Sequence, residues 1–262
     1  MMRRLPPETY GRDFFLSDSL EGYREYQEGT LSSLRTIHLE MLKVHSGVSV
    51  LEVGHGRGEL LLHCALSGAT IAGVDYSPEA HAIARETLAE FPDADLRLAD
   101  CKSLPFDSGS FDRVFSGDVI EHLCFDDAVE MLKEMYRVTK PGGFMLAHTT
   151  PNTIFTKFVY PWAKHILRRI DQDGIAGLDQ QLEVMKRLHV DEYNLFTLRR
   201  ACINAGLSQS MVWIDKDLMR RGTHRLIRRF AENGFARFVA SLGKYPIVRF
   251  FLGNDLYLRC DK

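Results

Sequence analysis

The sequence predicts an α/β fold built on a doubly wound, mainly parallel sheet, and three observations lead to this prediction. Short apolar runs alternate with helical patterns between residues 49 and 150. A glycine-rich turn joins the first of these runs directly to a helix. The length of 262 residues suits one large domain with insertions better than two full domains. Alternation of this kind is typical of parallel strands connected by helices.

The predicted elements begin with a helical region and continue as strand–helix pairs. Residues 13–45 carry apolar side chains at spacings near one helical turn, so we expect a helical cap over residues 1–48. Ser77 followed by Pro78 is typical of a helix start, because serine caps a free N–H group and proline fits the first turn. The predicted strands of the core are 49–53, 70–75, 95–100, 111–116 and 144–148, with helices over 58–67, from Ser77 onwards and over 126–138, and a turn at 141–143.

The last third of the chain departs from this alternation. A helix is predicted over 197–205, and the strands 207–214 and 255–260 follow without a crossover helix. Residues 153–189 and 215–253 fit neither pattern. We expect both segments to be helical insertions within a single domain whose core spans residues 49–150.

The composition indicates a soluble globular protein, with 45% apolar and 26% charged residues. The net charge of −2 gives no overall case for nucleic-acid binding. The five cysteines include no C-x-x-C pair, which argues against a structural zinc site and fits a reducing compartment. No apolar stretch is long enough to span a membrane, and the first residues lack the apolar run of a signal peptide. We therefore expect a cytoplasmic location.

The strongest local signal is a strand that runs into a glycine-rich turn, VLEVGHGRG over residues 50–58. Glycine lets the backbone approach a ligand closely, and the helix that follows offers unpaired N–H donors. The order is G-x-G-x-G at Gly54, Gly56 and Gly58, and Glu59 stands where the dinucleotide fingerprint has its third glycine. The alternative is a turn that only packs a strand against its helix.

Acidic residues end the next two predicted strands. Asp75 lies about 20 residues beyond the glycine turn, where a carboxylate can accept both hydroxyls of a ribose. Asp100 can accept from an adenine amino group while the backbone N–H of Cys101 meets the ring. Each aspartate alone is equally explained as a turn or capping residue. Together with the glycine turn they predict a nucleotide-like ligand at the carboxyl edge of the sheet.

Several motifs occur in order at matching spacing: LEVGHGRG, GVDYS, LRLADCKSLPF, FDRVFSGDVIEHL and VTKPGG. Together they resemble the class I S-adenosylmethionine-dependent methyltransferases, in the branch with EHL and KPGG signatures, over about residues 49–150. The later HVDEYNLFTLRRACINAGL resembles the segment that leads that family's last helix into its final strand pair. The resemblance implies a Rossmann-like, seven-stranded sheet with an antiparallel last strand, and S-adenosylmethionine as the cofactor.

The resemblance also implies roles for individual residues. Asp75 would hold the ribose and Tyr76 would lie against the adenine. Asp100 and Cys101 would hold the adenine edge, and Asp118 would border the sulfonium. The methionine part of the cofactor would be lined by Glu52, Gly54, Gly56 and Gly58. An upstream aromatic residue often closes such sites, and we choose Tyr23 from a set that also includes Tyr10, Phe14 and Phe15.

Candidates for catalysis follow the fourth and fifth predicted strands, where ligands of open α/β sheets bind. Methyl transfer from a sulfonium is an in-line displacement, so the protein mainly positions the reactants, and a base helps when the nucleophile carries a proton. We take His122 as the first choice of base and His148 as the second, with Asp118 beside them. The structural alternative is that Glu121 and His122 only bond the loop backbone.

A metal site is a further alternative at the same position. The D-x-x-E-H spacing of Asp118, Glu121 and His122 resembles the E-x-x-E-H arrangement of quinone-biosynthesis O-methyltransferases, where acids and histidine support magnesium. The first acid differs here, and histidine is an unusual ligand for that hard cation, so we expect no metal. For His189, which precedes the last core helix, the expected role is packing or capping.

The two insertions differ from the core in charge and suggest the nature of the acceptor. The first begins with an aromatic and basic stretch over 155–169, and the second holds nine Lys or Arg but only three acids. Residues Arg221, Arg225, Arg228 and Arg229 lie near one helical face, with Leu226, Ile227 and Phe230 towards another and Phe235, Phe238, Val239 and Leu242 continuing the apolar stripe. This pattern suits a lid helix with arginines in solvent, an interfacial helix on an anionic membrane, or a surface for an anionic substrate or nucleic acid. We expect a helical lid with an apolar mouth, and a hydrophobic or lipid-linked small-molecule acceptor.

The sequence therefore predicts a methyltransferase that acts on a small molecule, at oxygen in first place and at nitrogen or carbon as the alternative. A nucleotide-dependent oxidoreductase is disfavoured by Glu59, while a non-catalytic cofactor-binding scaffold stays open because the motifs report binding rather than turnover. The turn at 116–119 lacks the N-P-P-Y pattern of nucleobase amino-methyltransferases, so no nucleic-acid partner is expected. Contact with a membrane surface stays open, and the sequence does not define an oligomeric state.

Overall fold

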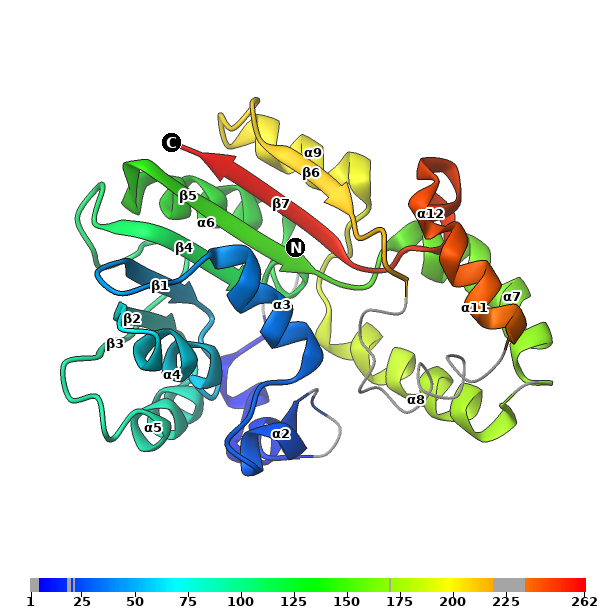
Figure 1. Ribbon diagram of the computed structural model, residues 1–262, viewed down its shortest axis with the longest axis horizontal. Coiled ribbons are helices and arrows are strands. Elements are labelled where there is room, and N and C mark those ends of the chain that lie inside the picture. Colours follow the sequence, from blue (N-terminus) through cyan, green and yellow to red (C-terminus); the bar gives the residue numbers. More distant parts are fainter. Residues whose placement is uncertain (1–4, 18–19, 21, 170, 219–233) are drawn as a thin grey trace.

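A seven-stranded sheet forms the centre of the computed structural model, which describes residues 5–17, 20, 22–169, 171–218 and 234–262. The strand order is β3-β2-β1-β4-β5-β7-β6 (Figure 1). Strands β1 to β5 are parallel, and β7 is antiparallel to both of its neighbours, which confirms the predicted sheet. The strands are β1 Ser49–Val53, β2 Thr70–Asp75, β3 Asp95–Leu98, β4 Phe111–Gly117, β5 Thr139–Thr149, β6 Met211–Ile214 and β7 Leu256–Asp261.

Helices cover both faces of the sheet, so the central strands are apolar on both sides rather than alternating. In β1, Leu51 packs into the cluster with α6 and α9, while Val50 faces α3 and α4 on the other side. The helices of these two layers are α3 Ser33–Leu42, α4 Glu59–Leu66, α5 Pro78–Thr87, α6 Phe125–Val138 and α9 Leu195–Asn204. These two layers cover the faces of the sheet, and they leave the loops at the carboxyl ends of β1 to β5 accessible to ligands.

The predicted helical region over residues 13–45 is divided into short pieces. These are the turn η1 Pro7–Thr9 and the helices α1 Arg12–Phe15, α2 Tyr23–Gln27 and α3. Gly22 and Gly29 have φ angles of 79° and 70°, which end regular helix on either side of α2. Ser32 then starts α3 by accepting a hydrogen bond from the N–H of Arg35.

Three strand boundaries also differ from the prediction, and the first difference is that β3 ends at Leu98 rather than at residue 100. Strand β5 begins at Thr139 and therefore includes the glycine pair that predicted a turn. Strand β6 begins only at Met211, because the N–H of Ser210 bonds back to the carbonyl of Leu207 in a turn. The differences in β5 and β6 lie at the starts of these strands and not at their carboxyl ends, where the candidate site lies.

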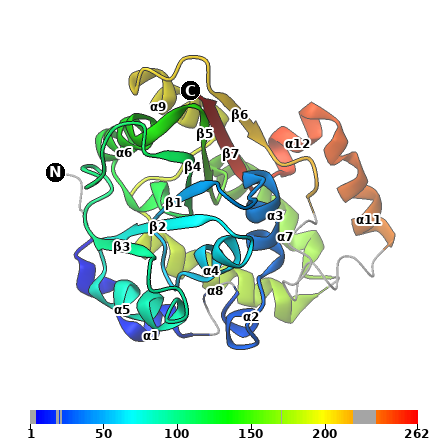
Figure 2. The ribbon, with the colours of Figure 1, turned by 60° about the vertical axis from the view of Figure 1, so that its left-hand side comes forward.

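Both insertions contain helices, and they leave the sheet at the same edge. The first forms η3 Phe155–Val159, α7 Tyr160–Leu167 and α8 Gln172–Leu188, and the second ends with α11 Gly234–Ser241, η4 Leu242–Lys244 and α12 Pro246–Leu252. We call these segments together the helical lobe. It extends beyond the carboxyl ends of β5 and β6 (Figures 1 and 2), and α12 contacts η3 within it. The predicted arginine face at Arg221, Arg225, Arg228 and Arg229, with Leu226, Ile227 and Phe230, lies outside the described residues.

No helix in the described part of the chain is both long enough and apolar enough to cross a membrane.

Candidate functional site

The glycine turn between β1 and α4 brings backbone N–H groups to the carboxyl edge of the sheet. Gly54, Gly56 and Gly58 have φ angles of 77°, 52° and 76°, a region that other residues rarely adopt. A side chain at position 54 would also overlap the methyl group of Val119. Gly58 is the N-cap of α4, so the helix begins directly at the turn. The turn needs glycine for its conformation as well as for ligand access.

Asp75 connects this turn to the end of β2. Its Oδ2 accepts from the N–H of Gly56 at 3.0 Å, and its Oδ1 accepts from the N–H of Ser77 at 2.9 Å. A carboxylate has about four lone-pair positions, so these two bonds leave acceptor capacity for a ligand. The side chain is thereby fixed in orientation beside the glycine turn, as a group that binds two ribose hydroxyls requires.

Glu52 supplies a second carboxylate beneath the turn, and it is almost wholly buried. Its Oε1 lies 3.3 Å from Nη1 of Arg35, while Oε2 has no hydrogen-bond partner among the residues that the structure describes. Burial raises the pKa of Glu52 to about 8. The group is therefore mostly protonated near pH 7, and a positively charged ligand group such as the ammonium of a methionine moiety would favour its ionised, accepting form. The glycine turn, Glu52 and Asp75 together therefore fit S-adenosylmethionine.

The remaining predicted cofactor residues also lie at the carboxyl edge. Asp100 follows β3, and its Oδ1 accepts from the N–H of Lys102 at 3.0 Å. Cys101 is half-buried beside it. Asp118 follows β4 with a φ angle of 57°, and its N–H donates to the carbonyl of His148. The strained backbone at Asp118 directs the loop after β4 over the end of β5.

His148, at the end of β5, has both ring nitrogens beside carboxylates. Nδ1 lies 3.1 Å from Oδ1 of Asp118, and Nε2 lies 3.0 Å from Oδ1 of Asp255. Burial lowers the pKa of His148, but the two aspartates outweigh it and raise the pKa to about 9. The imidazole is therefore protonated at neutral pH. This arrangement favours a positioning role for His148 over the role of a base.

The amino-terminal segment crosses the site, and Tyr10 rather than Tyr23 is the aromatic residue that reaches it. The Tyr10 hydroxyl lies 2.9 Å from Nδ1 of His122, and its ring packs edge-on against Tyr76. The Ser77 hydroxyl donates to the carbonyl of Tyr10 at 3.0 Å. The hydroxyl of Tyr23, in contrast, accepts from Gln27 on its own helix. The structure thus favours Tyr10 as the closing aromatic residue.

A second anchor holds the same segment against the glycine turn. Arg57 is buried and donates from Nη1 to the carbonyl of Phe15 at 3.0 Å. The same guanidinium pairs with Glu59, with Nε at 2.6 Å from Oε2. The position that distinguishes this turn from the dinucleotide fingerprint thus carries a glutamate that orients Arg57.

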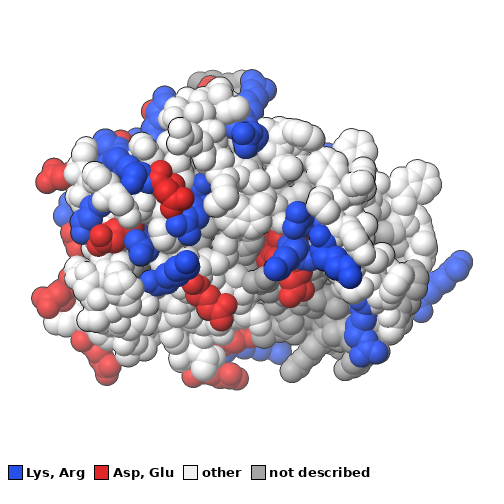
Figure 3. All heavy atoms as spheres, turned by 45° about the horizontal axis from the view of Figure 1, so that its top comes forward, with Lys and Arg blue, Asp and Glu red and all other residues white. Residues whose placement is uncertain are grey.

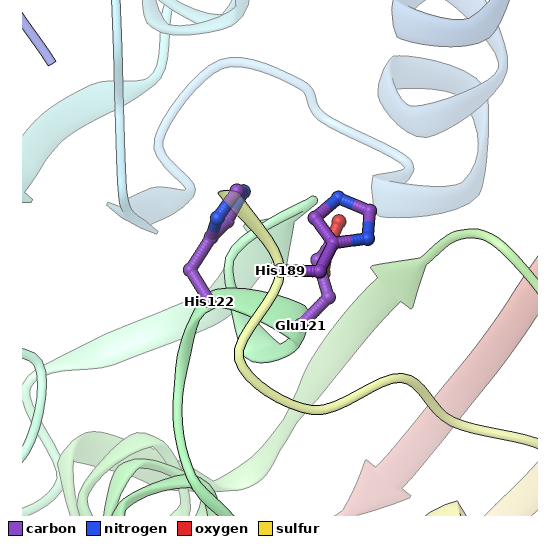
Figure 4. Close-up of side chains that lie close together, drawn as sticks. All are labelled: Glu121, His122 and His189. Atoms are coloured by element: carbon purple, nitrogen blue, oxygen red, sulfur yellow. The ribbon is translucent and has the colours of Figure 1, made fainter. Parts of the chain in front are cut away.

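Glu121, His122 and His189 form a compact cluster beside Asp118 (Figure 4). Glu121 and His122 belong to the turn η2 Ile120–His122, and His189 follows α8. The N–H groups of Val190 and Asp191 both donate to the carbonyl of Glu121, which brings the two segments together. Sequence reasoning assigned His189 to packing or capping, because nothing local to it indicates a contact with η2.

Burial governs the ionisation of this cluster. Burial and the nearby charge of Asp118 raise the pKa of Glu121 to about 7. Burial and the neighbouring His189 lower the pKa of His122 to about 4. His122 is therefore neutral near pH 7, and its Nδ1 is engaged by the Tyr10 hydroxyl and, at 3.2 Å, by the carbonyl of Leu188.

Comparisons with known proteins agree with this arrangement. A family model described as a methyltransferase domain matches residues 51–147. A demethylmenaquinone methyltransferase from Chlorobaculum tepidum is 33% identical over 125 residues, which cover 46% of this chain and 50% of that protein. A sterol 4-C-methyltransferase from Caenorhabditis elegans is 30% identical over 152 residues, which cover 56% of this chain and 44% of that one. The chain spans about half the length of these curated relatives.

Solved structures share the fold at low sequence identity. Phosphoethanolamine N-methyltransferase 2 from Haemonchus contortus, in complex with S-adenosylmethionine, aligns over 96% of this chain and 56% of that one, with a TM-score of 0.61 and 17% identity. The [4+2]-cyclase SpnF aligns over 87% of this chain and 79% of that one, with a TM-score of 0.55 and 18% identity. The fold is thus shared with a protein named for methyl transfer and with one named for a cyclisation.

Proposed function

We propose, since the chain belongs to the class I S-adenosylmethionine-dependent methyltransferases, that it transfers the methyl group of this cofactor to a small, hydrophobic acceptor. The observation that carries the proposal is the arrangement at the ends of β1 and β2. There the glycine turn, the buried Glu52 and the fixed carboxylate of Asp75 lie together. Tyr76, Asp100 and Cys101 continue this edge towards the adenine end, and Asp118 continues it towards the sulfonium.

The cofactor supplies an activated methyl group, so the residues of the chain mainly hold and align the reactants. We assign the ammonium to Glu52, the ribose hydroxyls to Asp75 and the sulfonium side to Asp118. The oxygen of a hydroxyl acceptor would form the new bond to the methyl carbon as the carbon–sulfur bond breaks towards sulfur. The proton of that hydroxyl would pass to the neutral imidazole of His122, which follows β4 at the part of the site where the acceptor is proposed to bind.

The acceptor atom is proposed to be a hydroxyl oxygen, with an activated carbon as the second choice. Removal of the proton from a phenol or enol raises the electron density on its oxygen and on the conjugated carbon. One proton acceptor can therefore serve methylation at oxygen or at carbon. Two relatives are named as acting on a quinone precursor and on a sterol, which supports a hydrophobic acceptor. The apolar side chains of the helical lobe lie on the same side as His122 and support it further.

The experiment that tests the function is calorimetric titration with S-adenosylhomocysteine, with NADH as the control ligand. We expect a single site with a Kd in the micromolar range or below for S-adenosylhomocysteine and no heat for NADH. Binding of NADH in its place would overturn the assignment to methyl transfer. Binding of S-adenosylhomocysteine without turnover, across a panel of hydrophobic phenols and sterols, would favour a cofactor-binding scaffold.

We further propose that the helical lobe contacts an anionic membrane surface. Trp162 and Ile247 are 79% and 76% exposed, and Phe158 and Phe238 of the same lobe are also exposed. The described residues of η3, α7, α11, η4 and α12 include basic side chains but no acidic ones. Figure 3 shows a largely uncharged surface at the right-hand end of the molecule, with basic groups at its rim. Apolar side chains flanked by Lys and Arg suit the interface of an anionic bilayer.

Co-sedimentation with vesicles tests the membrane contact. We expect binding to vesicles of equal phosphatidylglycerol and phosphatidylcholine that weakens in 0.5 M salt, because exposed basic groups are screened. The double variant Trp162→Ala, Ile247→Ala should bind at least tenfold more weakly, since each side chain contributes about 1.5–3 kcal/mol when fully buried and about 1.4 kcal/mol corresponds to a tenfold change in Kd. Leu66→Ala, which removes an exposed side chain at the end of α4, is the matched control. Equal binding of parent and double variant would contradict the proposal.

A further inference from the structure

We propose that Glu121, His122 and His189 form a binding site for a divalent transition-metal ion. Each of the three offers one ligand atom, and these atoms all lie within 4.8 Å of one another. They come from two segments far apart in the chain, η2 and the residue after α8. Among the described residues, these three form the one cluster of histidine, cysteine or acidic side chains whose ligand atoms lie close enough together to hold a metal ion. The proposal rests on the proposed function, because the three residues lie at the carboxyl edge of the sheet, where the acceptor is proposed to bind.

Hydrogen bonds behind the three side chains are those that orient metal ligands. Nδ1 of His122 is engaged by the hydroxyl of Tyr10 and the carbonyl of Leu188. Nδ1 of His189 lies 3.4 Å from a carboxylate oxygen of Glu192. Histidines that bind metals usually bond a carboxylate or carbonyl through the other ring nitrogen, which fixes the ring. With Nδ1 engaged in this way, we assign metal binding to Nε2 of both histidines.

The third ligand is supported in the same way. One carboxylate oxygen of Glu121, Oε2, accepts from the hydroxyl of Thr149 at 2.8 Å. Glu121 is buried, and no Lys or Arg is paired with it among the described ion pairs. The buried hydroxyl of Tyr193 lacks a hydrogen-bond partner among the described residues. A cation beside Glu121 would supply the positive charge that this buried carboxylate lacks.

The donor set indicates the class of metal. Two imidazoles and one carboxylate suit zinc, iron, cobalt or manganese, whereas magnesium prefers oxygen ligands in octahedral geometry. Asp118, which the sequence pattern would have supplied as the first ligand, is paired with His148 instead. The structure thus replaces the D-x-x-E-H arrangement by a site that recruits His189. The expectation that the chain binds no metal is revised by this proposal.

An ion held by three protein ligands keeps open coordination positions. An oxygen of the acceptor, such as a phenolate or enolate, would take one of them and be oriented towards Asp118. A bound ion lowers the pKa of a coordinated hydroxyl group, as it does for bound water. In the loaded protein His122 would therefore hold the ion, and the hydroxyl proton would leave to solvent rather than to the imidazole.

Cobalt titration of chelator-treated protein tests the site directly. We expect one Co²⁺ per chain, with visible absorption bands that Zn²⁺ abolishes by displacement. Glu121→Gln and His189→Gln should each weaken Co²⁺ binding by roughly tenfold or more. Loss of a hydrogen-bond partner of a metal ligand already lowers metal affinity by about that factor, and loss of a ligand itself should cost at least as much. His165→Gln, which removes an exposed histidine of α7, is the matched control and should bind like the parent.

Two further readings separate this proposal from the proposed function. S-adenosylhomocysteine affinity should be unchanged in Glu121→Gln and His189→Gln, because the hydrogen bonds of these two side chains go to Thr149 and Glu192 rather than to residues assigned to the cofactor. The thermal midpoint of the parent should rise with Zn²⁺, while that of both variants should not. Equal Co²⁺ binding by parent and variants, or no stoichiometric binding by the parent, would overturn the metal site. If the parent protein does not bind S-adenosylhomocysteine, the result would instead contradict the proposed function.

Discussion

Replacing Asp75 by alanine is expected to weaken the binding of S-adenosylhomocysteine roughly 100-fold, the largest loss from any single change at the cofactor site. The carboxylate would lose two charge-assisted hydrogen bonds to ribose, each worth about 1.5–3 kcal/mol, and a loss of about 3 kcal/mol corresponds to roughly a 100-fold change in Kd. The change also removes the acceptor for the N–H groups of Gly56 and Ser77, which fixes the glycine turn. Isothermal titration calorimetry measures the effect.

A control separates this loss from general damage to the domain. Asp93→Ala removes an exposed aspartate from the loop before β3, at the opposite end of that strand, and should leave S-adenosylhomocysteine affinity as in the parent. Thermal unfolding of both variants shows whether they are folded at the temperature of the titration. A folded Asp75→Ala protein that binds as tightly as the parent would place the ribose elsewhere.

His148→Asn is expected to lower the free energy of unfolding by about 3 kcal/mol, the lower end of the range for breaking a buried ion pair. The value lies at the lower end because Asp118 and Asp255 are 34% and 18% exposed and are partly hydrated. The variant should also lower kcat more than it raises KM for S-adenosylmethionine, because Asp118 would lose the contact that fixes it. Denaturant unfolding and steady-state kinetics provide the two measurements.

The pH dependence of this stability difference identifies its cause. The pKa of His148 is raised to about 9 in the folded protein, above the value of about 6.5 for an unperturbed histidine. A raised pKa contributes stability that is fully present below pH 6.5 and is lost as the pH rises through 9. The gap between parent and His148→Asn should shrink accordingly. A constant gap from pH 6 to pH 10 would contradict a charged imidazole, and the exposed His45→Asn serves as control.

The sheet could be predicted because its signals are local. Each strand of the core is a short apolar run next to a turn or capping residue, such as Ser77 before α5. In the amino-terminal region the apolar spacing predicts helical structure but does not show where it is interrupted. Gly22 and Gly29 interrupt that spacing, and their positive φ angles outweigh the apolar pattern on either side.

The residues of the candidate site could be predicted where they lie close together in the sequence or at the ends of neighbouring strands. The glycine turn and Asp75 belong to consecutive strands, so their proximity follows from parallel pairing alone. Tyr10 and His122 are separated by 112 residues, and their contact depends on how the amino-terminal segment crosses the sheet. His189 reaches Glu121 through backbone bonds from the loop after α8. No local pattern encodes such contacts, although the aromatic residues near the amino terminus were a partial signal.

The shared exit of the two insertions has a consequence for the evolution and engineering of the protein. Residues that follow β5 and residues that follow β6 meet in one helical lobe, where α12 contacts η3. A change in one insertion therefore affects the packing of the other, although residues 190–214, which include α9 and β6, lie between them. Chimeras between relatives should keep their folding and exchange their acceptor preference when both segments are grafted as a pair. Grafting either segment alone would leave it facing a foreign surface.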